Sequence, residues 1–143
     1  MFVSDILSQK GGLVYTVTPS TTVAQVAQQL STRRVGCVLV LRDNDEVAGI
    51  VSERDLVRAV AQHGPTALEM EVRQVMTRDV VSCTPDDSID QIMGMMTRGR
   101  FRHMPVVQRG ELLGLVSIGD VVKARLAETE HETEALKAYI VAG

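Results

Sequence analysis

The residues of this chain best suited to hold a ligand are a serine and an aspartate three positions apart, a spacing that occurs twice. The copies are Ser52-x-x-Asp55 and Ser117-x-x-Asp120, each after a short apolar run Gly-[Ile/Leu]-Val. A helical pattern begins at each aspartate, so the motif lies at the junction of a strand and a helix. Backbone amides at a helix start favour an anion, and a carboxylate accepts hydrogen bonds from vicinal hydroxyls. A ligand with a ribose and a phosphate can make both contacts, with its phosphate at the amides and its ribose hydroxyls on the carboxylate.

The same residue types also have a purely structural role. Serine is favoured as a helix cap and aspartate is favoured in the first helical turn. One copy alone is therefore ambiguous. Two copies at matching positions favour ligand binding, although a duplication copies structural residues as well.

Basic side chains accompany the second motif. Arg102 and His103 open the strand that precedes Ser117 and can supply positive charge for phosphates. Arg54, directly before Asp55, can reach the same cleft across the pseudo-twofold. The first copy lacks the cationic pair, so we predict that the Asp120 cleft is the better phosphate site. At the positions of Arg102, His103 and Pro105 the first copy has Gly36, Cys37 and Leu39, and at the position of Arg54 the second copy has Gly119.

Both motifs belong to an internal duplication. Asp120 minus Asp55 and Gly114 minus Gly49 both equal 65, while Thr84-Pro85 follows Thr18-Pro19 at an offset of 66. The slip of one residue lies in a turn, where loop length is least constrained. A repeat of this length indicates that the fold is built from two similar halves.

Each half is expected to run strand, helix, strand, strand, helix, a small α+β unit. A unit of about 60 residues is marginal alone because it buries too little surface. We therefore predict that the two halves pack sheet to sheet about a pseudo-twofold axis and form two related clefts. The expected elements include lead-in helices at 3–7 and 72–76, a turn at 9–12, short strands at 14–17 and 80–83, helices capped by Thr22 and Ser88, and helices that begin at Asp55 and Asp120.

The repeats set the expected boundaries. Residues 1–64 form the first repeat, 65–71 a linker, 72–126 the second repeat and 127–143 a helical extension. Val122, Leu126 and Leu136 keep a helical stripe beyond the repeat, which suggests contact with a second subunit. The acidic run between them is expected to be a solvated helix face.

Composition excludes several classes of protein. The chain is 45% hydrophobic but only 3% aromatic, so the core must be aliphatic and rich in methionine. No apolar run is long enough to cross a membrane, and the N-terminus lacks the features of a secretory signal, which favours a cytoplasmic protein. A net charge of -3 makes nucleic acid an unlikely partner. Cys37 and Cys83 are expected to be buried, reduced thiols.

These motifs resemble a tandem pair of CBS domains (a Bateman module) over residues 3–126, and particularly stand-alone bacterial CBS-pair proteins with a trailing helix. The resemblance rests on Gly49-Ile50-Val51-Ser52-x-x-Asp55-Leu56, Gly114-Leu115-Val116-Ser117-x-x-Asp120-Val121, Thr84-Pro85 with Ser88-Ile89, and Arg102-His103-Met104-Pro105-Val106.

The resemblance implies binding of adenosine-containing ligands such as AMP, ADP, ATP, S-adenosylmethionine or NAD(H), with no further cofactor required. It implies that Asp55 and Asp120 hold ribose hydroxyls, with Ser52 and Ser117 near the ribose or phosphate. It places the base of the Asp120 site against Val17 and Thr18, and that of the Asp55 site against Cys83 and Thr84. CBS pairs are also typically homodimers in which four repeats form a flat disc.

Two alternatives stay open beside a nucleotide sensor with no chemistry of its own. An enzyme is disfavoured because the three histidines are isolated in sequence and the common catalytic and nucleotide-loop motifs are missing. A ligand-independent dimeric scaffold is the other, with the cluster Met93, Met95 and Met96 as an adaptable contact surface. The regulated partner protein is not identified by the sequence.

Overall fold

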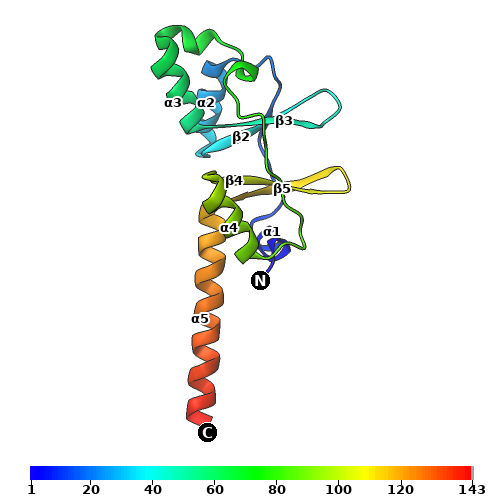
Figure 1. Cartoon of the computed structure of the whole chain (residues 1–143), viewed down its shortest axis with the longest axis vertical. Coiled ribbons are helices and arrows are strands. Elements are labelled where there is room, and N and C mark those ends of the chain that lie inside the picture. The colour runs from blue at the N-terminus through cyan, green and yellow to red at the C-terminus, as the bar shows by residue number, and fades with distance from the viewer. Residues whose placement is uncertain (143) are drawn as a thin grey trace. The chain divides into compact units, whose positions relative to one another are not determined.

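The structure, a computed structural model, describes residues 1–142 and combines helices with two small sheets (Figure 1). It divides into two compact units that do not follow the sequence repeats. The first-repeat unit is Val14–Val80, and the second-repeat unit joins Met1–Leu13 to the chain from Val81 onward. The lead-in segment of each repeat therefore packs with the other repeat.

The first-repeat unit contains a three-stranded sheet in the order β1-β2-β3, with β1 parallel and β3 antiparallel to β2. Its core joins one face of this sheet to α2 and to Val72 from the second lead-in segment, all aliphatic as expected. The elements are β1 (Thr16–Val17), α2 (Val23–Arg33), β2 (Cys37–Leu41), β3 (Val47–Ser52), α3 (Glu53–His63), and the 3-10 helices η1 (Gly64–Glu69) and η2 (Val72–Gln74).

The second-repeat unit contains the antiparallel pair β4 and β5, packed with three helices. Its core includes Val3 and Ile6 from the chain start, together with Ile92, Met96 and Met104. The elements are α1 (Val3–Lys10), α4 (Ile89–Gly99), β4 (His103–Gln108), β5 (Glu111–Ser117) and α5 (Ile118–Ala142).

Local sequence explains where these elements begin and turn. The hydroxyls of Thr22 and Ser88 each accept a hydrogen bond at 3.2 Å from the amide three residues on, which confirms both predicted caps. The two-residue turn between β4 and β5 has positive φ at Arg109 (53°) and Gly110 (77°), the conformation that matches the twist of paired strands.

Several expected elements need correction. The strand predicted at 80–83 is wrong, because Cys83 makes only a single bridge to Val106, and the strand at 14–17 is reduced to Thr16–Val17. The lead-in at 72–76 is a short 3-10 helix, and the helices after the two motifs begin at Glu53 and Ile118. The turn predicted at 9–12 is shorter than expected, because Gln9 and Lys10 complete α1 and the chain bends only at Gly11 and Gly12. The cluster considered as a contact surface belongs to the core region, because Met96 is buried and Met93 and Met95 pack against the core as half-buried residues.

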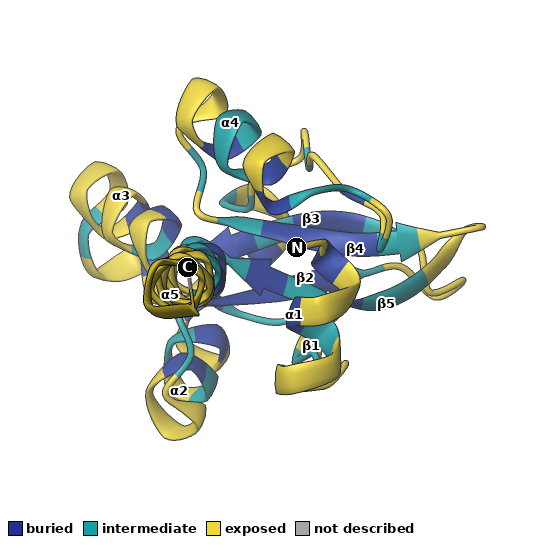
Figure 2. Cartoon of the chain, turned by 90° about the horizontal axis from the view of Figure 1, so that it is seen from below, coloured by how far each residue is buried: buried dark blue, intermediate teal, exposed yellow. Residues whose placement is uncertain are grey.

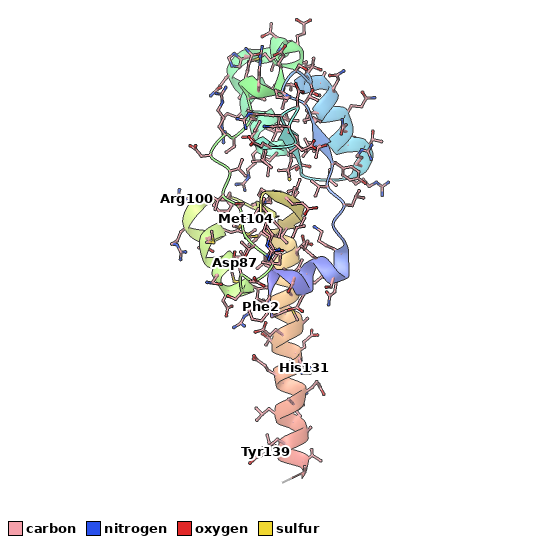
Figure 3. All side chains as sticks on the ribbon, turned by 90° about the vertical axis from the view of Figure 1, so that its right-hand side faces the viewer. Phe2, Asp87, Arg100, Met104, His131 and Tyr139 are labelled. Carbon is pink, nitrogen blue, oxygen red and sulfur yellow. The ribbon has the colours of Figure 1, made fainter. Side chains whose placement is uncertain are left out.

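Helix α5 confirms the predicted extension. It continues to Ala142, and every residue from 129 to 142 is exposed, as the yellow part of α5 in Figure 2 shows. His131 and Tyr139 mark this part of the helix in Figure 3. Within residues 1–142, no helix combines the length and the apolar character that spanning a membrane requires.

Candidate functional site

The serine and aspartate of each motif bond each other's backbone, so both motifs are helix caps. The Ser117 amide donates to Asp120 Oδ2 at 2.9 Å, and the Asp120 amide donates to Ser117 Oγ at 3.1 Å. The corresponding distances for Ser52 and Asp55 are 2.9 Å and 3.4 Å. The structural role of these residues is therefore real, and any ligand role is additional to it.

The structure brings the predicted cationic pair to the start of α5. The Ile118 amide donates to the carbonyl of Arg102 at 2.8 Å, and His103 lies opposite Ser117 in the sheet. In the first-repeat unit the Glu53 amide likewise donates to the carbonyl of Gly36 at 3.0 Å, with Cys37 opposite Ser52. Gly36 and Cys37 are thus the structural counterparts of Arg102 and His103. The two copies therefore carry different residues, two basic and two uncharged, at equivalent positions.

Lys10 is the residue that sequence reasoning missed. Its Nζ lies 2.7 Å from Asp120 Oδ2 and donates to the carbonyl of Leu115 at 2.9 Å. Burial alone raises the pKa of Asp120. The hydrogen bonds from Lys10 and Ser117, with the charge of Lys10, outweigh that effect and lower the pKa below its usual range. Asp120 is therefore ionised at neutral pH, and its side chain is 25% exposed.

Asp55 is more deeply buried than Asp120 and accepts more hydrogen bonds. Only 6% of its side chain is exposed. Its Oδ1 accepts from the Thr77 hydroxyl at 3.2 Å and from Arg58 at 3.4 Å, and its Oδ2 accepts from both the amide and the hydroxyl of Ser52. Of the two carboxylates, Asp120 is the one more open to a ligand.

The remaining predicted site residues divide between the units. Val17 is buried in β1, while Thr18 and Arg54 are exposed, and all three belong to the first-repeat unit. Cys83 is buried and Thr84 exposed in the second-repeat unit, where Pro105 is buried in β4 opposite Leu115. Each predicted base-lining pair and Arg54 thus lie in the unit opposite the aspartate they were assigned to, and those assignments stay predictions.

The described residues offer little for metal or thiol chemistry. Within residues 1–142, no cluster of three or more His, Cys, Asp and Glu side chains is arranged to hold a metal ion. Burial and, to a smaller extent, the charge of Asp87 raise the pKa of the Cys83 thiol to about 12. Cys83 is consequently protonated at neutral pH, which is unfavourable for a nucleophile or metal ligand.

The sequence contained only an indirect indication that Lys10 belongs to the site. Lys10 is the only basic residue before Arg33 and stands next to Gly11-Gly12. Its position beside Asp120 depends on which repeat the lead-in helix packs against, and the sequence pattern carries no information on that choice.

Comparisons with known proteins agree with this architecture. The sequence model of the CBS domain matches residues 3–62 and 72–127. A curated relative, the mitochondrial CBS domain-containing protein CBSX3 of Arabidopsis thaliana, is 32% identical over 99% of this chain and 72% of its own length.

Two solved structures share the fold. The CBS-domain containing protein ATU1752 from Agrobacterium tumefaciens matches with a TM-score of 0.86 and 46% identity, over 87% of this chain and 99% of that one. The CBS domain pair of protein MJ0100, solved with 5′-methylthioadenosine and S-adenosyl-L-methionine, matches with a TM-score of 0.79 and 20% identity, over 90% of this chain and 98% of that one.

Proposed function

This chain belongs to the CBS-domain family as a tandem pair, and from that premise we propose that it is a regulatory module that binds an adenosine-containing nucleotide and catalyses no reaction itself. The observation that carries the proposal is the Asp120 motif. An ionised, partly exposed carboxylate stands at a helix start, beside Lys10 and the backbone of Arg102. The oxygens of Asp120 suit ribose hydroxyls, and the Lys10 ammonium suits a phosphate.

The ligand class is further supported by a relative. The CBS pair of protein MJ0100 was solved with two adenosine-containing molecules, although at 20% identity the likeness extends to the fold alone. For this chain we propose AMP, ADP, ATP, NAD(H) or S-adenosylmethionine, with the Asp120 motif as the main site. Val17, Thr18 and Arg54 stay candidates for the Asp120 site, and Cys83 and Thr84 stay candidates for the Asp55 site.

The experiment is calorimetric titration of nucleotide-free protein with AMP, ATP, NADH and S-adenosylmethionine. Asp120→Asn keeps the shape of the side chain but removes its charge. We expect one ligand class to bind the wild type, and Asp120→Asn to weaken it at least about tenfold, as the loss of a hydrogen bond to a charged group does. Asp55→Asn should weaken that binding less.

A matched control removes a charge elsewhere in the second-repeat unit. Asp90 is exposed in the first turn of α4, so Asp90→Asn should leave the affinity unchanged. If the wild type binds none of the four ligands and none raises its melting temperature, the sensor proposal fails and a ligand-independent scaffold replaces it. A ligand that binds the folded state must stabilise it, by about 2.7 kcal/mol at one hundred times its Kd.

We also propose that the module acts as a homodimer and that the bound ligand alters the packing of the dimer, which a partner protein then recognises. A ligand has this effect only through different affinities for the two states. The apolar face at the start of α5 supports a second copy as the occupant. A hollow of about 580 Å³ lies there, lined by Ile118, Gly119, Val122, Lys123, Leu126, Ala127 and Glu130.

A further inference from the structure

The start of the chain is held against the second repeat by packing on both sides of Lys10. Ile6 is buried in the core of the second-repeat unit, and Leu7 lies against Gly114 of β5, where an added Cβ would approach Leu7 Cδ2 to 2.7 Å. Beyond Lys10, a Cβ on Gly12 would meet the carbonyl oxygen of Leu113 at 2.6 Å. The Lys10 ammonium is consequently positioned at Asp120 by the fold and does not reach it by chance from a loose terminus.

The first-repeat unit repeats this arrangement with a different side chain. Residue Thr77 bridges Ile50 of β3, next to Gly49, and its hydroxyl donates to Asp55 Oδ1 at 3.2 Å. The lead-in segment of each repeat thus brings a donor to the aspartate of the other repeat. At Asp55 that donor is a neutral hydroxyl, whereas at Asp120 it is an ammonium.

Asp120 can accept further hydrogen bonds while it is paired with Lys10. Lys10 and the Ser117 amide both bond Oδ2, and a carboxylate offers about four acceptor positions in total. The ammonium has three donors, of which Asp120 and the Leu115 carbonyl take two, so one is left for a ligand. A ligand that places a ribose on Asp120 therefore places its 5′ substituent within the field of this cation.

We propose that Lys10 makes the Asp120 site select nucleosides that carry a 5′-phosphate over uncharged nucleosides and over the sulfonium-bearing S-adenosylmethionine. The inference rests on the proposed nucleotide-binding function and names the charge of its ligand. The remaining donor of the ammonium forms a charge-assisted hydrogen bond with a phosphate, and neither the 5′ hydroxyl of adenosine nor a sulfonium offers it an anionic acceptor at that position.

The test compares AMP, adenosine and S-adenosylmethionine by calorimetry on wild type, Lys10→Met and Lys10→Arg. We expect Lys10→Met to bind AMP about 10- to 100-fold more weakly, the range for a lost hydrogen bond to a charged group, with adenosine changed less than about threefold. S-Adenosylmethionine should bind Lys10→Met no more weakly than the wild type. Lys10→Arg keeps the charge and should keep the preference for AMP.

The control is Arg98→Met, which removes a positive charge from the exposed last turn of α4 and should alter no affinity. Equal losses for AMP and adenosine in Lys10→Met would mean that Lys10 only positions Asp120, and the inference would be overturned while the sensor function stands. Preference of the wild type for S-adenosylmethionine would overturn it as well. Failure of the wild type to bind any of the three overturns the proposed function, and this inference with it.

Discussion

Asp120 shows how one side chain serves two purposes at the scale of a residue. Its Oδ2 caps α5 through the Ser117 amide and also pairs with Lys10, and these donors hold its pKa below the usual range despite partial burial. A lowered pKa in the folded state means that the unfolded chain binds more protons at acidic pH. The stability that this carboxylate contributes is therefore fully present above its unfolded value of about 3.9 and is lost as the pH falls through its folded value.

The pairing with Lys10 should appear in the pH dependence of unfolding. We expect Lys10→Met to lower the free energy of unfolding near pH 7, and the difference from the wild type to shrink as the pH is lowered from about 5 to about 3. Urea unfolding at several pH values measures both. Arg98→Met, in the exposed last turn of α4, should show no comparable trend, and a difference for Lys10→Met that is independent of pH would contradict the pairing.

Gly49 and Gly114 occupy equivalent positions beneath the crossing lead-in segments but should tolerate alanine differently. At Gly49 a Cβ would lie 2.8 Å from the carbonyl oxygen of Thr77 and 2.6 Å from Met76 Sδ, so backbone would have to move. At Gly114 the nearest atom is the flexible end of Leu7 at 2.7 Å. We expect Gly49→Ala to cost about 1–3 kcal/mol and Gly114→Ala less, measured by urea unfolding. The reverse order would show that the lead-in segments are held differently.

At the scale of elements, the exchange of lead-in segments ties the two repeats together within each compact unit. Helix α1 is first in the chain, yet its Val3 and Ile6 are buried with residues of α4, β4, β5 and α5. In return Val72 is buried with residues of β1, α2, β2 and β3. Neither repeat contains its complete core in its own sequence, which gives a physical reason for their occurrence as a pair.

A core substitution in α1 should therefore destabilise the unit formed by the second repeat. Ile6 is 5% exposed, so Ile6→Ala is expected to cost about 2–5 kcal/mol. Faster amide exchange in β4 and β5, more than in β2 and β3, would place the loss in the second-repeat unit. Leu13→Ala is the control in the same segment, because Leu13 is 73% exposed and its truncation should cost less than about 0.5 kcal/mol. Equal effects of the two substitutions would contradict the packing of α1.

In the molecule as a whole, the exposed apolar residues of α5 indicate an interaction surface. Val122 and Leu126 are 44% and 59% exposed, and Leu136, Tyr139 and Ile140 continue the exposure along the extension. Apolar side chains gathered on one helix are typical of interaction surfaces. The proposed occupant is a second copy of this chain.

Placing a charge on this face should disrupt the dimer. We expect the wild type to sediment as a dimer and Leu126→Glu to shift it toward the monomer with little change in helix content, because Leu126 is exposed within one chain. Asn44→Glu, in the exposed turn between β2 and β3, should sediment like the wild type. A monomeric wild type would reject the homodimer, and a dimeric Leu126→Glu would move the interface elsewhere.

The duplication was visible in the matching spacing of the two copies, and the CBS-pair fold followed from the resemblance of their motifs to that family. The helix caps could be predicted from the sequence because their side chains act within a few residues of themselves. Ser52, Ser117 and their aspartates were found this way, as were Thr22 and Ser88. Short segments, which are too brief to show a hydrophobic period, were assigned less well. Cys83 was assigned to a strand, although it makes only one bridge.

The surroundings of the two aspartates could not be predicted from the sequence, because they depend on long-range packing. Lys10 and Asp120 are 110 residues apart, and their pairing follows from α1 packing on β5 of the other repeat. Two similar repeats present similar apolar faces to a lead-in helix, so hydrophobic pattern cannot choose between them. The packing that results, with its close fit at Gly49 and Gly114, places an ammonium at one carboxylate and a hydroxyl at the other.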